Sequence, residues 1–391
     1  MGYIGNQITT VFPSSVTVDK INDVTYVPNP PSGQITGRRN IVINGAMQVA
    51  QRATSATGLG ANGFTYNTLD RFKNVMAGSS AGRYTQTQES ITDLAGFSKC
   101  LKFACTTADT SIAADEILQV GQYFEGQDVQ HLKKGTSDAE KVTVSFYVKG
   151  NASATYTCEL HDVDNTRYNG QTFSVTTSWN RVVLTFDGDT TGTFDNDNAN
   201  SLQLNIFLHA GSTYTGGTFS SNTWQTANNQ RANSSQTSFY DSTSRTFFIT
   251  GIQMELGEVT NPIFEHRSFG EELGLCQRFF QQYARSSAST YRVILTGNGG
   301  SNPLGGFSYV KTMRANPSAN YFGGDVDGGN FNVNSPINGS QANTAPSSIT
   351  TAKDTLLWNF TSASTASQDD PHWIDCGTGT NQFSWTLDAE L

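Results

Sequence analysis

Two glycine-rich stretches have the spacing of motifs that carry cofactor binding or catalysis. Residues 58–63, GLGANG, match G-x-G-x-x-G, whose backbone amides hold a pyrophosphate when a strand precedes them and a helix follows. Residues 78–82, GSSAG, match G-x-S-x-G, which presents a nucleophilic serine on a turn between a strand and a helix. No helical pattern begins at residues 64–67, and residues 83–86 read as another strand. Both stretches are therefore predicted to be loops without a chemical role.

Metal chemistry has no support in the spacing of ligating residues. Metal-binding spacing is absent among the histidines, at positions 131, 161, 209, 266 and 372. The five cysteines include no C-x-x-C pair, which argues against a zinc site, and their odd number argues against a disulfide framework. An EF-hand loop needs a glycine at its sixth position and a glutamate at its twelfth. The acidic runs at residues 195–198 and 325–328 do not meet this requirement, so they are predicted to form turns. No cofactor is expected, and the sequence does not support a structural calcium ion.

Glycoside cleavage would need two carboxyl groups that flank the bond to be broken. Glu255 and Glu258 are close together in the sequence, but at a strand end and its turn they read as solvated charges. No catalytic residue is assigned, and the chain is predicted not to be an enzyme.

Aromatic residues in polar surroundings are the best signal of ligand binding. Sugar rings stack their apolar faces on Trp and Tyr, while polar side chains bind the hydroxyl groups. Trp224, in a stretch rich in Ser, Thr and Asn, is one predicted glycan contact. His372, Trp373 and Asp375 near the C-terminus form the other predicted group. The alternative for each is an aromatic residue that packs half-buried against the core.

One amphipathic helix is predicted, over residues 267–285. Ser268 and Glu271 have the spacing of a capping box, in which each side chain binds a free backbone N–H at the start of the helix. Leu273, Cys276, Phe280 and Tyr283 recur at helical spacing, and Leu275 and Phe279 widen this apolar stripe. These residues are assigned a structural role at a junction between two β regions.

The preceding region, residues 39–266, has the alternation of strands with one buried face. Apolar residues occupy every second position in residues 142–148, 182–186 and 202–208, and turn clusters separate the strands. Many short strands without helical crossovers predict an all-β protein whose main domain is an antiparallel jelly-roll sandwich. Residues 211–243 are its longest insertion.

Smaller segments are predicted on either side. Strand patterns return after the helix, so residues 286–391 are predicted to form a second, small β domain. Residues 1–38 are too short to bury a core and contain a Pro-rich linker at residues 28–33. They are predicted to attach the chain to a partner, with a disordered tail as the alternative.

Composition and charge exclude several classes of protein. Charged residues make up 15% of the chain, below the roughly 25% of an average globular protein, and the 24 Phe and 14 Tyr favour strands. The formal net charge of −9 repels phosphate backbones, so nucleic-acid binding is not expected. No apolar run has membrane-spanning length, and the N-terminus has no secretory signal. This profile suits an extracellular or virion protein that leaves the cell by lysis and does not insert into membranes.

The sequence resembles phage tail-fibre and virion structural proteins along most of its length. NIVINGAMQVAQR at residues 40–52, followed by LDRF at 69–72, is similar to their "NLLINGNFDIWQRG…ADRW" opening. FEHRSFGEELGLCQRFF at residues 264–280 is similar to their closing "FEHRSYGEELALCQRYYE". VSFYVK at 144–149 and MRANP at 313–317 resemble two further strands of these proteins.

Two departures from the pattern leave it recognisable: Val49-Ala50 stands where a Trp is common, and Phe279-Phe280 replaces a Tyr pair. The resemblance implies a jelly roll like those of carbohydrate-binding modules, often carried on homotrimeric fibres. It also implies a non-enzymatic tail-fibre or fibre-tip protein of the virion that adsorbs to a host-surface receptor, expected to be a glycan. Residues 1–38 would bind other virion proteins. The alternatives are a capsid decoration or collar protein without a receptor, and a polysaccharide depolymerase.

Overall fold

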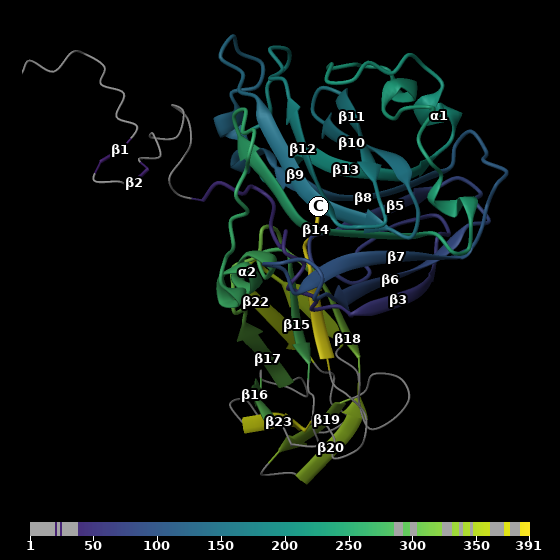
Figure 1. The fold of residues 1–391 in the computed structure, drawn as a ribbon. Helices are drawn as coiled ribbons and strands as arrows, with labels where there is room; N and C mark the ends of the chain where they lie inside the picture. Colours follow the sequence, from purple (N-terminus) through teal and green to yellow (C-terminus); the bar gives the residue numbers. More distant parts are fainter. Residues whose placement is uncertain are drawn as a thin grey trace, which may run out of the picture.

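The computed structural model describes residues 20–21, 24–25, 38–284, 292–297, 303–322, 331–335, 339–344, 347–359, 371–375 and 384–391. Two six-stranded sheets form a sandwich, drawn in the upper part of Figure 1, and a second β region lies below it. All the strand pairs of the sandwich are antiparallel. The predicted fold class is confirmed: an antiparallel jelly-roll sandwich is followed by a helix and a smaller β domain.

The first sheet has the strand order β11-β10-β13-β8-β5-β4. Its strands in chain order are β4 (Gly63–Thr65), β5 (Lys73–Ala77), β8 (Ile117–Glu125), β10 (Ala154–Asp162), β11 (Arg167–Val175) and β13 (Asn200–Ala210). The second sheet has the order β12-β9-β14-β7-β6-β3. Its strands are β3 (Ser55–Leu59), β6 (Arg83–Ser90), β7 (Lys99–Thr107), β9 (Val142–Gly150), β12 (Asn180–Phe186) and β14 (Thr246–Leu256).

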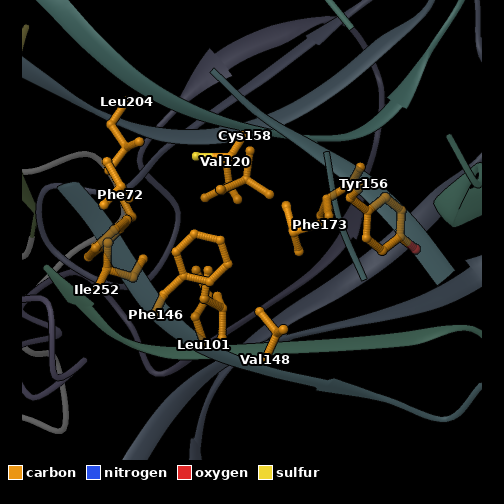
Figure 2. Packing of buried hydrophobic residues seen from close by; sticks show 14 of the residues in the cluster. Phe72, Leu101, Val120, Phe146, Val148, Tyr156, Cys158, Phe173, Leu204 and Ile252 are labelled. Atoms are coloured by element: carbon orange, nitrogen blue, oxygen red, sulfur yellow. The ribbon is translucent and has the colours of Figure 1, made fainter. Parts of the chain in front are cut away.

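The core of the sandwich lies between the inward faces of these sheets, as Figure 2 shows. Phe146 of β9 meets Phe173 of β11 edge to face, with ring centroids 5.0 Å apart. Val144 and Val148 are fully buried on the same face of β9 as Phe146. The two-residue alternation read from the sequence therefore places apolar side chains in the core.

The second β region contains a three-stranded sheet and a seven-stranded sheet, with the orders β15-β24-β18 and β20-β19-β23-β16-β17-β22-β21. The strands are β15 (Phe280–Ala284), β16 (Arg292–Gly297), β17 (Pro303–Ser308), β18 (Ser318–Phe322), β19 (Phe331–Ser335), β20 (Gly339–Thr344), β21 (Ser348–Thr351), β22 (Thr355–Asn359), β23 (Pro371–Asp375) and β24 (Ser384–Asp388). Trp358 and Trp385 stack in its core with ring centroids 5.0 Å apart.

The predicted helix over residues 267–285 is wrong in length. Helix α2 spans Phe269–Cys276, and the chain enters strand β15 at Phe280. Strand β15 pairs with β24 along its length, and this pairing satisfies the backbone groups that a longer helix would have bonded internally. Phe280 and Tyr283 therefore lie on a strand, and their helical spacing from Cys276 has no structural meaning.

The start of α2 agrees with the sequence in one half of the capping box. The Ser268 hydroxyl accepts a hydrogen bond from the Glu271 backbone N–H, at 3.3 Å. The Glu271 carboxylate instead pairs with Arg38, at 2.6 Å. Leu273 is half-buried, Cys276 is fully buried, and Tyr283 packs on the core of the second β region.

Of the two glycine-rich stretches, residues 78–82 form a connection as predicted, whereas residues 58–63 are a connection only in their middle. Residues 58–63 run from the end of β3 through the connection at residues 60–62 to the start of β4, and residues 78–82 join β5 to β6, so neither motif precedes a helix. The remaining elements are a two-residue pair, β1 (Lys20–Ile21) and β2 (Val24–Thr25), and the short helical turns η1 (Gly126–Asp128), η2 (Gln130–Leu132), α1 (Ser212–Thr215), η3 (Asn228–Gln230) and η4 (Phe239–Asp241). Within the described ranges, no helix combines the length and apolar character needed to cross a membrane.

Charged side chains connect the sandwich to the second β region. The fully buried Glu125 carboxylate at the end of β8 receives hydrogen bonds from Arg278, at 2.9 to 3.0 Å, and Arg314 lies 3.4 Å away. Arg71 of the sandwich forms a buried ion pair with Glu390. The last residues of the chain thus return to the sandwich, where Figure 1 places the C-terminus.

Candidate functional site

Trp224 makes the contacts of a packing residue. Its ring packs against the sandwich core, and its indole N–H donates to the Asp187 carbonyl oxygen, at 2.8 Å. The Lys134 ammonium lies 5.7 Å from the ring centre. These contacts match the alternative that the sequence left open, and a role of Trp224 in glycan binding stays a prediction.

The second predicted group lies on a strand rather than in a loop. His372, Trp373 and Asp375 belong to β23, which is paired on both sides with β16 and β19. The side chains of this strand lie outside the described part of the structure, so their assignment as glycan contacts also stays a prediction. Trp373 and Trp224 are on different domains, and nothing in the described contacts brings the two groups together.

Lys134, beside Trp224, occupies a cage of oxygen atoms. Its ammonium lies 2.5 Å from the Asp162 carboxylate, 3.2 Å from that of Asp189, and 2.7 and 2.8 Å from the carbonyl oxygens of Thr191 and Gly192. Arg167 binds Asp189 through two hydrogen bonds, at 2.6 and 3.1 Å. The charges of Lys134 and Arg167 thus balance those of Asp162 and Asp189 in a buried site. The contacts of Lys134 connect its own loop to the loop that contains residues 189–192. Within the described residues, no cluster of His, Cys, Asp and Glu could hold a metal ion.

Ser238, His209 and Glu116 form a hydrogen-bonded chain that no local sequence pattern indicates. His209 Nδ1 lies 2.8 Å from the Ser238 hydroxyl, and Nε2 lies 3.1 Å from the Glu116 carboxylate. This is the order of a nucleophile, a base and an acid. However, the same Ser238 oxygen also accepts the Tyr240 N–H and caps η4, and the His209 ring is fully buried. We therefore interpret the chain as an anchor for the insertion of residues 211–243.

The outer face of the first sheet is covered by the same insertion. Arg231 forms two hydrogen bonds to Glu159 on β10, both at 2.8 Å, and Asn205 on β13 donates to the same carboxylate at 3.0 Å. The Arg231 guanidinium also packs on the Tyr168 ring, 4.7 Å from its centre. The polar and aromatic side chains of this face are thus bonded to each other.

An open cleft remains where the first described residues of the sandwich meet α2 and the turn η1–η2. Its volume is about 380 Å³, within the range of ligand pockets. We call it the junction cleft. It has an apolar part and a polar part, formed respectively by Ile41, Ile43, Leu256 and Leu275 and by Arg38, Arg39, Asn40, Asp128, His131, Glu255 and Arg267.

Arg267 forms a fixed wall of the junction cleft. Its guanidinium donates to the carbonyl oxygens of Asn40 and Val42 and forms ion pairs with Glu265 and Glu272, at 3.3 and 3.4 Å. Only 5% of its side chain is exposed. Arg267 therefore positions the irregular segment at residues 40–42 rather than facing a ligand freely. This explains structurally why the FEHRS segment carries an arginine here.

Arg39 and Arg38 are the more accessible cations of the cleft. The Arg39 guanidinium donates one hydrogen bond, to the Ile263 carbonyl oxygen at 2.9 Å, and its Nη1 lies 3.6 Å from Glu255. Its side chain is 25% exposed, whereas that of Arg38, paired with Glu271, is 61% exposed. A guanidinium has five N–H donors, so both side chains retain donors for a ligand.

Asp128 and His131 face the cleft from the turn η1–η2. Both side chains are exposed, but neighbouring protein atoms displace part of their water. This desolvation, with a smaller effect from Glu125, raises the pKa of the Asp128 carboxyl group, and desolvation lowers the pKa of the His131 imidazole. A histidine with a lowered pKa is neutral at pH 7 and offers one donor and one acceptor. No local sequence pattern marks these two residues, because the cleft forms only when β14 and the turn come together.

Comparisons with family models and with curated protein sequences gave no match. Among solved structures, the chain is similar to one described as CBM4 structure and function, with 13% identity over 55% of this chain and 97% of that chain and a TM-score of 0.28. It is also similar to the family 11 carbohydrate-binding module of the Clostridium thermocellum cellulase Lic26A-Cel5E, with 12% identity over 52% and 99% of the two chains and a TM-score of 0.25. TmCBM61 in complex with β-1,4-galactotriose has 9% identity over 56% and 99%, with a TM-score of 0.27. With TM-scores below 0.5, these similarities assign no ligand or activity to the chain.

Proposed function

We propose that this chain is a non-enzymatic phage virion protein, a tail-fibre or fibre-tip component that adsorbs to a host-surface glycan through the junction cleft. The resemblance of residues 40–52 and 264–280 to tail-fibre proteins supports the virion role. The same resemblance supports a homotrimer, attached to the particle through residues 1–38. A particle protein of this kind would be assembled in the host cytoplasm and exposed on the virion.

The lining of the junction cleft is the observation that carries glycan binding. A sugar ring has apolar CH faces and hydroxyl groups at its rim, and it is bound best where apolar surface and hydrogen-bonding groups alternate. Ile41, Ile43 and Leu275 supply the apolar surface, while Arg39 and His131 supply donors and an acceptor. A cleft of about 380 Å³ accommodates a small part of a glycan rather than a whole chain.

A glycan array probed with the full chain tests this site. We expect binding that is lost in Leu275→Trp, because the larger side chain fills the cleft. The control is Ile112→Trp, which adds the same indole at an exposed position outside the cleft lining. Equal binding by the wild type and Leu275→Trp would place the glycan elsewhere, and an array without any signal would contradict glycan adsorption.

Two further measurements test the virion role. Immunogold labelling at the fibre tips supports the proposal, whereas labelling over the head or the collar supports the decoration-protein alternative. Light scattering on the purified chain tests the homotrimer. A mass of one chain at high protein concentration would contradict it.

A polysaccharide depolymerase is the second candidate function, because two carboxyl groups line the same cleft. Asp128 has a raised pKa, as a general acid requires, and Glu255 lies beside Arg39. Incubation of host polysaccharide with the chain would release new reducing ends if this candidate is correct, and Asp128→Asn would abolish the release. The absence of product would remove the candidate and leave adsorption intact.

A further inference from the structure

The three arginines of the junction cleft differ in how fully their charges are neutralised. Arg267 is surrounded by two carboxylates and two carbonyl oxygens, and Arg38 has Glu271 as its partner. The carboxylate paired with the Arg39 guanidinium is that of Glu255, and the 3.6 Å between the two groups is longer than a hydrogen bond. In addition, one oxygen of Glu255 already accepts a hydrogen bond from Gln253, at 2.8 Å. The Arg39 guanidinium also donates to the Ile263 carbonyl oxygen, but its charge has the loosest carboxylate pairing of the three.

The backbone that carries Arg39 is held rigidly. The N–H groups of Arg39 and Asn40 both donate to the Glu265 carboxylate, at 2.5 and 2.9 Å. The buried Asn40 side chain donates to the Ile252 carbonyl oxygen at 3.1 Å and accepts the N–H groups of Val42 and Met254, both at 3.0 Å. A guanidinium on such a support loses less conformational entropy when it binds a ligand than one on a free loop.

A guanidinium presents parallel N–H donors that match the two oxygens of a carboxylate. Arg39 and Arg38 are adjacent in the chain and both line the cleft, next to the apolar side chains of Ile41 and Ile43. A ligand that fits this arrangement has a carboxylate on one edge and an apolar face beside it. The net charge of −9 disfavours long polyanions in general, so selection here rests on short-range pairing within the cleft.

We propose that the junction cleft recognises a sugar that carries a carboxylate, as in uronic or sialic acids. Arg39 pairs with that carboxylate, and the positive charge of Arg38 adds to the attraction. This inference rests on the proposed glycan binding and adds the class of sugar. Arg267 stays bound to the protein and holds the cleft open. His131, at the polar side of the cleft, binds a hydroxyl group of the same sugar.

Calorimetry on the full chain tests the inference with matched ligands. The probes are sialyllactose with lactose, and a glucuronate-containing tetrasaccharide with its carboxyl-reduced form. We expect the carboxylate form of at least one pair to bind about tenfold or more tightly than its neutral counterpart. Arg39→Met should remove this preference, so that the two members of each pair bind with equal affinity, while Arg38→Met should weaken the preference several-fold.

Arg181→Met is the control, since Arg181 is a partly exposed arginine of β12 outside the cleft, and it should keep the wild-type preference. If Arg39→Met does not fold, Arg38→Met still decides, because its side chain is 61% exposed and contributes little to folding. Equal affinity for both members of every pair, or a preference that survives both substitutions, overturns the inference and leaves glycan binding intact. No binding of any probe, together with a blank glycan array, overturns the proposed function as well.

Discussion

At the scale of single residues, Asp70 is a buried carboxyl group whose ionisation opposes folding. Burial raises its pKa to about 6 from an ordinary 3.8, and this effect exceeds the lowering by hydrogen bonds from Gln51 and by Arg52, 3.6 Å away. The folded protein therefore holds this proton more tightly than the unfolded chain. The resulting contribution to stability is fully present below pH 3.8 and is lost as the pH rises through about 6.

We expect Asp70→Asn to remove this pH dependence. Between pH 4 and pH 8, the free energy of unfolding of the variant should improve relative to the wild type by about 2 kcal/mol, whatever constant offset the lost hydrogen bonds introduce. Urea denaturation across this pH range measures the difference.

Asp93→Asn provides a control of opposite sign. A hydrogen bond from Lys149 and a second from Trp179 lower the pKa of Asp93, so its contribution is lost as the pH falls. A difference between Asp70→Asn and the wild type that stays constant with pH would show that Asp70 has an ordinary pKa.

At the scale of elements, the start of α2 depends on its N-cap. Ser268→Ala removes the hydrogen bond to the Glu271 N–H and should lower the free energy of unfolding by about 1 kcal/mol. Ser268→Asp should retain most of the stability, because aspartate is also a good N-cap residue. Thermal denaturation of both variants distinguishes a cap from a role of the serine in packing, which would make the two substitutions equally harmful.

The loops at one end of the sandwich depend on the Lys134 ammonium. Lys134→Met keeps an unbranched side chain but leaves Arg167 as the remaining cation beside Asp162 and Asp189. This substitution should lower the free energy of unfolding by about 3 kcal/mol. The adjacent Lys133 is the matched control, since it pairs with Glu140 at the surface and Lys133→Met should change stability little. Equal denaturation midpoints for the two variants would contradict a structural role of the oxygen cage.

The elements differ in how well the sequence predicted them. Alternation within residues 142–148 predicted a strand of the core correctly, because burial of one face imposes that period. The Ser268 cap was also predicted correctly, since it depends on neighbours within one turn. The predicted length of the helix is too great because the apolar spacing of Cys276, Phe280 and Tyr283 fits a helix. The structure there is decided by the pairing of β15 with β24, a strand that lies far away in the sequence.

The site was harder to predict than the fold for the same reason. Trp224 was identified by its polar neighbours in the chain, but its indole group bonds to Asp187, which lies 37 positions away. The junction cleft brings residues near position 40 together with Asp128, Glu255 and Leu275. No single window of sequence contains that combination, so local patterns could not indicate it.

At the scale of the whole molecule, the buried charges at the domain junction determine whether the two β regions behave as one body. Glu125 of the sandwich is separated by 153 positions from Arg278 and lies against Arg314 as well. Arg52 adds an ion pair to Asp388, at 3.1 Å, and its guanidinium packs 3.6 Å from the centre of the Phe280 ring. A fully buried carboxylate with two arginine partners is costly to leave unpaired, so the regions should separate only when both lose structure.

We therefore expect one cooperative unfolding transition for the wild type and two for Glu125→Gln. The amide cannot neutralise Arg278 and Arg314, and the loss of this buried ion pair should weaken the junction by about 3 kcal/mol. The smaller β region, which relies on the junction for part of its buried surface, should then unfold at a lower temperature than the sandwich. Differential scanning calorimetry resolves the transitions, and Glu140→Gln, which removes a surface carboxylate of the sandwich, is the control that should keep a single transition. One transition at an unchanged temperature in Glu125→Gln would show that apolar contacts alone hold the two regions together.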